Sequence, residues 1–383
     1  MKMQAPWQLV VAASAAASLV LTACGGDSSD DDSGGGGSGG AGVDVAAAQE
    51  AIEPLTQPPT EFPVTEPLAE LPPPGTTAAF LDIGTPTPAK VYEQLRQAGE
   101  VLGIEVQRVQ TGRSPQEINA AMNSLVESRP DIVIDLAIDP ALFSPQLEAL
   151  QEQGAVFIPE SIVNAEEFGF DDSQVSVGAA GATDSGRVLA SAVLAETNGE
   201  ATELAYYRVP ELPFTPLILE GVEERLAEQC PDCELRVVDI SITEVGSTAS
   251  RTVVSDLQAN PETDAFIVSV DELQIGLPAA MDVAGLDVPG MGIAPTEVNL
   301  QQVADGQQLG ALASDPRMLA WMAMDQALRT LAGQEYDYSE FYTKMHPALF
   351  QVITEDNVPS DIEAGYIAFD DYKEQFTKLW TGQ

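Results

Sequence analysis

The sequence has little histidine and little positive charge. Its 383 residues include a single histidine, His346, and 16 lysines and arginines against 60 aspartates and glutamates, giving a net charge of −44. Such an acidic surface repels the phosphates of DNA, RNA and anionic lipids, so we expect no nucleic-acid partner. One histidine cannot form an HExxH zinc motif, and nothing singles out an acid–base pair. We therefore expect neither an enzyme nor a metal or other cofactor.

Cysteine is also scarce, with Cys230 and Cys233 standing close together in EQCPDCELRV. Outside the cytoplasm such a pair oxidises, so we expect a structural disulfide. A redox motif is an alternative, but it would open a helix, where the helix dipole lowers a thiol pKa, and this pair follows a helical run. Half of a zinc site is another alternative, and it would need two further ligands.

The apolar run near the start of the chain is too short to span a membrane. Leu9 to Ala23 is a run of 15 residues without a charge, short of the roughly 20 that cross a bilayer. With Lys2 before it, this run predicts a secretory signal peptide over residues 1–23. Its end, Leu-Thr-Ala-Cys at 21–24, resembles a bacterial lipobox, in which cleavage precedes a lipid-bearing cysteine. The resemblance implies lipidation of Cys24 and an extracytoplasmic, membrane-attached protein; the alternative is a secreted protein in which Cys24 is incidental.

Residues 24–75 have the composition of a linker. No apolar residue larger than alanine occurs from Gly25 to Gly42, which predicts a flexible tether. The stretch from Glu53 to Pro74 is rich in proline, which favours a stiffer, extended spacer. We expect this linker to hold a folded part, residues 76–383, away from the membrane.

From Thr76 on, strands and helices alternate. Helical runs end at Gly103, Gly154 and Gly285, the residue that most readily takes the left-handed conformation after a last helical turn. The expected strands are 78–83, 105–110, 132–138, 155–160, 203–209, 234–240, 265–271 and 288–293. Such alternation predicts an α/β fold with parallel, doubly wound sheets, and two similar halves predict two lobes with a ligand cleft at the carboxyl ends of the strands.

Several segments together resemble the type I periplasmic binding proteins, the ribose- and galactose-binding-like solute receptors of ABC importers. They are AAFLDIGTPTPAKVYEQLRQAGEVLGIEV, PDIVIDLAIDP followed by GAVFIPES, IVSVDELQIGLPAAMDVAGLDVPGMGI, VADGQQLGALASDPRMLAWMAMDQAL and FQVITEDNV. The resemblance implies lobe 1 at 76–178 plus 315–350 and lobe 2 at 179–314 plus 351–383. Three hinge crossings would lie near Gly178, Ser314 and Gln351. It also implies a monomer that closes around one small polar, sugar-like molecule and delivers it to a membrane permease.

The resemblance places the ligand contacts in the loops after the strands. We expect contacts from eight residues: Thr85, Thr87, Asp139, Glu160, Arg208, Phe214, Asp271 and Asp315. Asp271 follows an apolar strand where the family has an Asx residue, although it could equally cap the next helix. Two departures weaken a sugar assignment: Ser161 follows Glu160 where sugar receptors have an arginine, and the GTPTP loop lacks an aromatic residue. A receptor for a more apolar solute therefore stays an alternative. So does a sensory receptor that signals through a membrane partner, because it would share the fold and the cleft.

Overall fold

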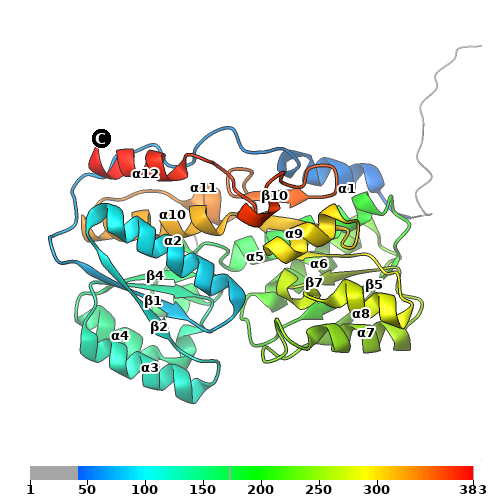
Figure 1. Ribbon diagram of the computed structural model, residues 1–383, viewed down its shortest axis with the longest axis horizontal. Coiled ribbons are helices and arrows are strands. Elements are labelled where there is room, and N and C mark those ends of the chain that lie inside the picture. The colour runs from blue at the N-terminus through cyan, green and yellow to red at the C-terminus, as the bar shows by residue number, and fades with distance from the viewer. Residues whose placement is uncertain (1–41, 172–173, 383) are drawn as a thin grey trace, which may run out of the picture. The chain divides into compact units, whose positions relative to one another are not determined.

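The computed structural model describes residues 42–171 and 174–382 (Figure 1). The expected signal peptide, the lipid-bearing Cys24 and the glycine-rich tether as far as residue 41 lie outside these residues. The expected α/β class is confirmed: two sheets, each with helices on both faces, form two lobes.

Lobe 1 is built on a parallel sheet with the strand order β2-β1-β3-β4. Its strands are β1 (Thr77–Asp82), β2 (Glu105–Gln110), β3 (Ile132–Leu136) and β4 (Val156–Glu160). Its helices are α2 (Pro86–Leu102), α3 (Pro115–Ser128), α4 (Ser144–Glu152) and α10 (Pro316–Leu331), with short 3-10 turns η2 (Pro140–Leu142) and η3 (Ala165–Phe168).

Lobe 2 is built on a six-stranded sheet with the order β10-β9-β8-β7-β5-β6, in which only the β10–β9 pairing is antiparallel. Its strands are β5 (Glu203–Arg208), β6 (Glu234–Asp239), β7 (Ala265–Val268), β8 (Gly290–Ile293), β9 (Gly310–Ser314) and β10 (Phe350–Ile353). Its helices are α5 (Ala179–Glu196), α6 (Thr215–Gln229), α7 (Ala249–Ala259), α8 (Leu277–Ala284) and α9 (Glu297–Ala304), with the 3-10 turn η5 (Asp271–Gln274).

Alternate side chains of the central strands point to opposite faces of each sheet. In β1, Phe80 packs in the core beneath α2, whereas Leu81 packs in a separate core with α3 and α4. In β5, Tyr206 lies on the α5 and α6 side, and Tyr207 lies on the α7 and α8 side. Strands buried on both faces have continuous apolar sequences, which is why these strands are visible in the sequence.

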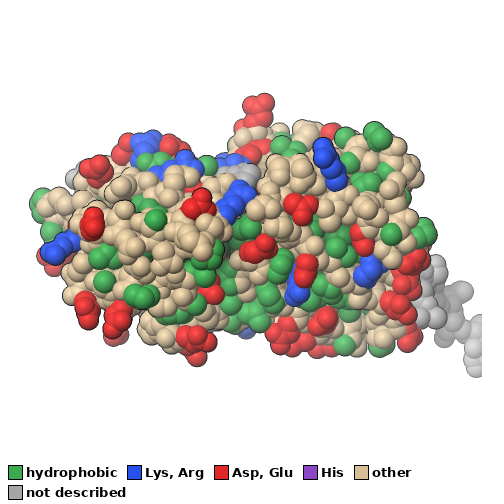
Figure 2. All heavy atoms as spheres, turned by 90° about the horizontal axis from the view of Figure 1, so that it is seen from below, with side chains coloured by type: hydrophobic (Ala, Val, Ile, Leu, Met, Phe, Trp, Pro, Cys, Tyr) green, Lys and Arg blue, Asp and Glu red, His purple; other side chains and the backbone are tan. Residues whose placement is uncertain are grey.

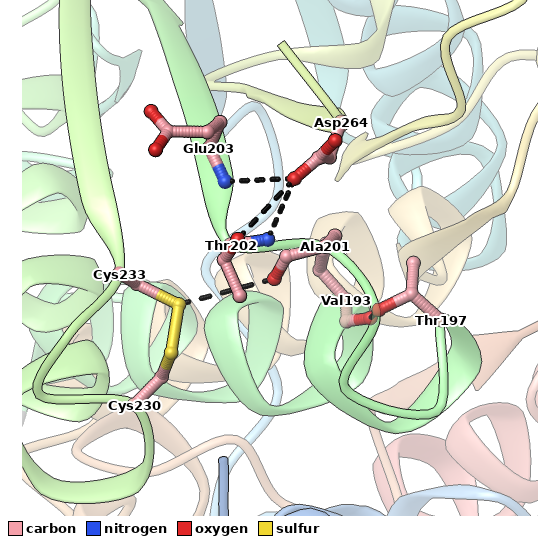
Figure 3. The surroundings of a disulfide bond; sticks show 8 residues. All are labelled: Val193, Thr197, Ala201, Thr202, Glu203, Cys230, Cys233 and Asp264. Carbon is pink, nitrogen blue, oxygen red and sulfur yellow. Dashed lines mark hydrogen bonds between the residues drawn. A yellow bond between two sulfur atoms is a disulfide. The ribbon is translucent and has the colours of Figure 1, made fainter. Parts of the chain in front are cut away.

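The two lobes repeat one local device at the start of the central strand. An aspartate just before the neighbouring strand accepts hydrogen bonds from backbone N–H groups that have no partner in the sheet. In lobe 1, Asp131 accepts from the Thr77 amide at 2.7 Å. In lobe 2, Asp264 accepts from the Thr202 and Glu203 amides, both at 3.0 Å (Figure 3). With the shared strand order, this marks the lobes as two versions of one unit.

The end of the chain returns to lobe 1. Helix α12 (Tyr372–Thr381) lies over α10 in Figure 1, and Trp380 stacks on Trp321 of α10 with ring centroids 5.1 Å apart. Strand β10 thus pairs with β9 in the lobe 2 sheet, whereas α12, which was expected in lobe 2, packs against α10 of lobe 1. Short helical segments α11 (Ser339–Tyr342) and η6 (Ile362–Ala364) lie on either side of β10 in the chain.

The second half of the expected linker is folded onto the protein. Residues 44–70, here called the N-terminal strap, begin with helix α1 (Val45–Ile52), which packs against α5 of lobe 2, and continue through η1 (Glu53–Leu55). Figure 1 shows this blue segment running from α1, over lobe 2, along the top of the molecule towards β1 of lobe 1. The expectation of a solvated spacer is wrong here, because its apolar side chains are buried: Ala48, Ile52, Leu55, Val64 and Leu68.

The strap makes backbone contacts with both lobes. On lobe 2, the Asp44 amide donates to the Gln229 carbonyl at 2.7 Å. On lobe 1, the Leu68 amide donates to the Leu379 carbonyl of α12 at 2.9 Å, and the ring of Phe62 packs edge-on against Phe376. The strap is thus a further connection between the lobes, besides the passages of the chain from β4 to α5 and from β9 to α10.

Cys230 and Cys233 are joined by a disulfide between the end of α6 and the start of β6 (Figure 3). Their Cα atoms are 5.4 Å apart, and the sulfur of Cys233 lies 3.8 Å from the Ala201 carbonyl oxygen. The pair lies at the C-terminal end of its helix, where the helix dipole does not favour a thiolate. This position fits a structural link better than a redox motif.

Candidate functional site

The main cavity lies between the lobes, at the carboxyl ends of their strands. Lobe 1 contributes Ile83 after β1, Leu136 at the end of β3 and Glu160 at the end of β4. Lobe 2 contributes the loop after β5, including Leu212 and Phe214, and the segments after β6, β7 and β8. The cavity thus lies at the edges where ligands of open α/β sheets bind.

The walls of this cavity are mostly hydrocarbon. Figure 2 looks into the space between the lobes from below, and green hydrophobic side chains gather there between two acidic outer surfaces. The apolar lining comes from both lobes and the hinge, and it includes Phe80, Ile134, Leu212, Ile242, Val270 and Phe350. Among the described residues that line the cavity, none is lysine or arginine. The cavity has a volume of about 160 Å³, which suits a small molecule.

Glu160 is the buried acid of this cavity. Its side chain is 5 % exposed, and its Oε1 atom has no hydrogen-bond partner among the described residues. Burial raises the pKa of Glu160 to about 8, although a hydrogen bond with Ser176 works in the opposite direction. At neutral pH the carboxyl group is therefore largely protonated and can donate as well as accept a hydrogen bond.

Backbone conformations that L-residues rarely adopt gather around the cavity. Ala137, Ser161, Val177 and Ala294 all line it, and all have positive φ angles between 51° and 63°. The left-handed region is least accessible to a β-branched residue such as Val177. Strained backbone of this kind persists where the surrounding structure holds it, and it concentrates at ligand-binding sites. These four positions therefore indicate that the cavity is a binding site maintained by the fold rather than a void left by imperfect packing.

Three contacts connect the lobes beside the cavity. The Thr87 hydroxyl and amide of lobe 1 both donate to Oε1 of Glu272 in lobe 2, at 2.6 Å and 3.0 Å. Lys90 forms an ion pair with Glu297 of α9. The Arg113 guanidinium donates to the Ile242 carbonyl at 2.9 Å. These bonds can form only when the lobes are close together, so the structure represents a closed arrangement.

Four of the eight expected site residues line the cavity: Thr85, Thr87, Glu160 and Phe214. Thr85 precedes α2 but makes no helix-capping hydrogen bond with its side chain. Thr87 is engaged with Glu272, as described above. Phe214 packs with the apolar residues of both cores and presents part of its surface to the cavity.

Asp271 and Asp315, expected in the cleft, lie behind its wall. Asp271 is fully buried and accepts hydrogen bonds from the Gln274 and Gln308 side chains at 2.7 Å and 3.1 Å. Burial raises the pKa of Asp271 to about 8. The Oδ1 atom of Asp271 packs directly against β8. A Cβ atom added to Gly292 of that strand would lie only 2.4 Å from this oxygen, so there is no room for a side chain at that position. Asp315 caps α10 and accepts from the Ala368 amide at 2.8 Å, which joins the hinge to the segment before α12.

Arg208 and Asp139, the other two, are outside the cavity as well. Arg208 forms an ion pair with Asp239 at the ends of β5 and β6, with a closest N–O distance of 2.5 Å. Asp139 accepts from the Ala141 amide at 2.9 Å and from the Asn164 side chain at 3.0 Å, which shapes the turn after β3. Both residues lie at the ends of expected strands. The Arg208 guanidinium and the Asp139 carboxylate, however, each bond to residues of their own lobe.

The contacts that sequence reasoning missed are apolar. Leu136, Leu212, Ile242 and Val270 follow or end strands just as the polar candidates do. Their apolar character gives no sign of ligand contact, and only their positions after strands point to the cleft. Phe80 and Phe350 lie inside strands and carry no sequence signal for a ligand.

The sequence model described as periplasmic binding protein domain matches residues 81–335. The chain belongs to the periplasmic binding protein family. The type I fold expected from the resemblance is confirmed, and the proteins of this family bind solutes rather than convert them. No curated protein matches the sequence of this binding protein.

Solved structures of similar fold are solute-binding proteins. An ABC sugar transporter subunit from Rhodobacter sphaeroides 2.4.1 has 20% identity and a TM-score of 0.60, covering 74% of this chain and 99% of its own. A solute-binding protein from Actinobacillus succinogenes 130z with bound D-allose has 18% identity and a TM-score of 0.62, covering 76% and 100%. A 5-methylthioribose transporter binding protein from Thermotoga lettingae TMO has 13% identity and a TM-score of 0.64, covering 79% and 98%. At these identities the likeness concerns the fold.

The described residues of this binding protein lack a membrane-spanning helix and a cluster of metal ligands. No helix there is long and apolar enough to cross a membrane. No group of three or more histidine, cysteine, aspartate or glutamate side chains in that part could hold a metal ion.

Proposed function

We propose that this binding protein is an extracytoplasmic receptor of an ABC importer, attached to the membrane by lipid on Cys24. It closes its two lobes around one small solute and presents the closed form to a membrane permease. The observation that carries the proposal is the cavity itself, which takes its walls from both lobes. A ligand held by both walls stabilises the closed form over the open one, which is the differential affinity that hinge closure requires.

The contacts beside the cavity support this mechanism. Thr87 and Glu272 form their hydrogen bonds only across the closed cleft. Hydrogen bonds to a carboxylate contribute about 1.5–3 kcal/mol each in net terms, so these contacts favour the closed state by only a few kcal/mol without ligand. The ligand supplies the rest of the free energy of closure.

We propose Thr85, Thr87, Glu160 and Phe214 as ligand contacts from the expected set, since these four line the cavity. The neighbours of similar fold suggest a sugar-like solute, because one holds D-allose and another holds 5-methylthioribose. The apolar walls favour a less polar solute than D-allose. The disulfide between Cys230 and Cys233 fits an oxidising, extracytoplasmic location, and we propose that the protein works there as a monomer.

The test begins with the protein purified from its own cells. Mass spectrometry of the material released by denaturation identifies any retained solute, and cells with and without the gene are then compared for uptake of that compound. We expect the solute to be released in about equimolar amount and its uptake to fall when the gene is deleted. Unchanged uptake with a lost transcriptional response would support the sensory alternative instead. A Cys24→Ala variant found in the soluble fraction would support the lipid anchor, and one still in the membrane fraction would contradict it.

A further inference from the structure

The cavity is small and its shape is determined by apolar side chains from three directions. Phe80 and Ile134 come from strands of lobe 1, Leu212 and Ile242 from loops of lobe 2, and Phe350 from β10 at the edge of the lobe 2 sheet. Its volume of about 160 Å³ is close to that of apolar cavities, about 150 Å³, that stay dry and accept a molecule of the size of benzene. The body of the ligand must therefore be compact and largely hydrocarbon.

One fully buried side-chain atom of this cavity, on Glu160, lacks a hydrogen-bond partner among the described residues. The Oε1 atom of Glu160 is buried and has no hydrogen bond among the described residues. Buried polar groups are almost always paired, and leaving one unpaired is unfavourable. Since Glu160 lines the cavity, a ligand atom is the partner that its position makes available.

The other polar side chains restrict the charge of the ligand. An anion would need a positive partner, and the described lining has no lysine or arginine. An ammonium group has three donors and no acceptor, so it would need several acceptors converging at one end of the cavity. The second acid of the lining, Glu272, already accepts two hydrogen bonds at one oxygen from Thr87. A sugar would need a partner for every hydroxyl that enters the apolar walls. Besides the two acids, the described lining offers only hydroxyl side chains, two of which are already bonded to Glu272 and Glu160: Thr87, Ser176, Thr85, Ser161 and Ser314.

We propose that the cleft binds a compact, uncharged solute whose surface is mostly hydrocarbon and which offers one hydrogen-bonding group to Glu160. The proposal rests on the proposed receptor function and narrows its ligand class. The Glu160 carboxyl orients the polar end of the solute towards β4, and the phenylalanine and leucine side chains of both lobes enclose its apolar body. A neutral partner suits this site because no charge has to be buried without compensation.

The experiment is a calorimetric titration of the complete mature chain carrying Cys24→Ser, with five probes of similar size. They are benzyl alcohol, toluene, benzylamine, benzoate and D-ribose. We expect saturable binding of benzyl alcohol about tenfold tighter than that of toluene, since one hydrogen bond contributes about that factor. Benzylamine and benzoate should bind at least tenfold more weakly than benzyl alcohol, and ribose should not bind.

Two substitutions of Glu160 test the role of its carboxyl group. Glu160→Leu should abolish the preference for benzyl alcohol over toluene while keeping toluene binding, because the apolar walls are unchanged. Glu160→Gln should retain the preference, since an amide can still donate and accept. The matched control is Asp139→Asn in the neighbouring loop, whose carboxylate bonds to Ala141 and Asn164 and is not part of the lining; it should leave all titrations unchanged.

Tightest binding of ribose, benzylamine or benzoate overturns the proposed ligand class, and so does binding of none of the five probes. A benzylamine affinity lost in Glu160→Gln would identify a cationic ligand. A separate measurement tests the proposed receptor function. That function is wrong if the radius of gyration from small-angle scattering is the same with and without a saturating ligand of any class. If ribose binds and reduces the radius of gyration, the receptor function is supported and only the proposed ligand class is wrong.

Discussion

Substitution of Asp325 by alanine tests whether one buried ion pair holds the strap and the last helix to lobe 1. Asp325 and Arg329, one helical turn apart in α10, are 0% and 1% exposed. The Asp325 carboxylate accepts from Arg329 Nε at 2.7 Å, from the Tyr338 hydroxyl at 2.7 Å and from Trp380 Nε1 of α12 at 2.8 Å. The Arg329 guanidinium also donates to the Glu66 carbonyl of the strap at 2.5 Å.

The magnitude follows from what the substitution leaves behind. Removing one member of a buried pair strands the other charge, which costs about 3–5 kcal/mol. Arg329 keeps the strap carbonyl and the face of the Tyr336 ring, with its guanidinium carbon 4.6 Å from the ring centroid, so we expect the lower end of that range. For a folded part of about 340 residues, an unfolding entropy of about 0.7 kcal/mol/K converts 3 kcal/mol into a fall in Tm of about 4 °C.

The assay is urea denaturation of the wild type, Asp325→Ala, Arg329→Met and the double variant Asp325→Leu/Arg329→Met. Because the double variant strands no charge, its loss of stability should be smaller than the sum of the single losses by about 2 kcal/mol. Limited proteolysis should also cut the strap faster in Asp325→Ala, since Arg329 no longer has a fixed position beneath Glu66. Tyr338→Phe is the control, because it removes one donor from the carboxylate and should cost about 1 kcal/mol.

The reasoning is refuted if Asp325→Ala costs less than 1 kcal/mol, or if the two single losses simply add. The first result would mean that water reaches Arg329 and solvates its charge. The second would mean that the two side chains stabilise the protein independently of one another.

Three further predictions follow from the same structure. Because burial raises the pKa of Glu160 to about 8 from about 4.3 in the unfolded chain, its stabilising effect is complete below about pH 4.3 and is lost as pH rises to 8. Glu160→Gln should therefore reduce the fall of unfolding free energy with pH by up to about 1.4 kcal/mol per pH unit; an unchanged slope in urea titrations between pH 5 and 8 would contradict this. A chain lacking residues 42–75 should unfold at lower urea concentration than one that contains them, since their buried apolar side chains lose their contacts; equal midpoints would show that the strap adds no stability. Replacing Cys230 and Cys233 together by serine should lower the free energy of unfolding by about 2 kcal/mol, the loop entropy of a short closed ring. In the same assay the reduced wild type should be destabilised equally, so it should match the serine variant. An oxidised wild type that is no more stable than the serine variant would contradict this prediction.

The strands and helices could be predicted because their signals are local. The central strands are short apolar runs, and Gly103 and Gly285 end α2 and α8 in the left-handed conformation that the sequence indicated, with φ angles of 71° and 69°. The N-terminal strap was mistaken for a spacer because its few apolar residues, such as Leu55 and Val64, have no helical or strand period. Their burial depends on a surface formed by α5, α10 and α12, which no local pattern describes.

Local patterns in the sequence were enough to predict the α/β class, the two repeated lobes and the loops that face the cleft, because the period of apolar residues and the glycine stops act over a few neighbouring residues. The tertiary structure alone decided which side chains of those loops reach the cavity. Asp271 and Asp315 turn into networks with Gln308 and the Ala368 amide, while Leu212 and Phe214 face the cavity. The physical reason is that a polar side chain at a strand end bonds to whichever partner the packed chain places nearest, and that partner lies tens of residues away in the sequence.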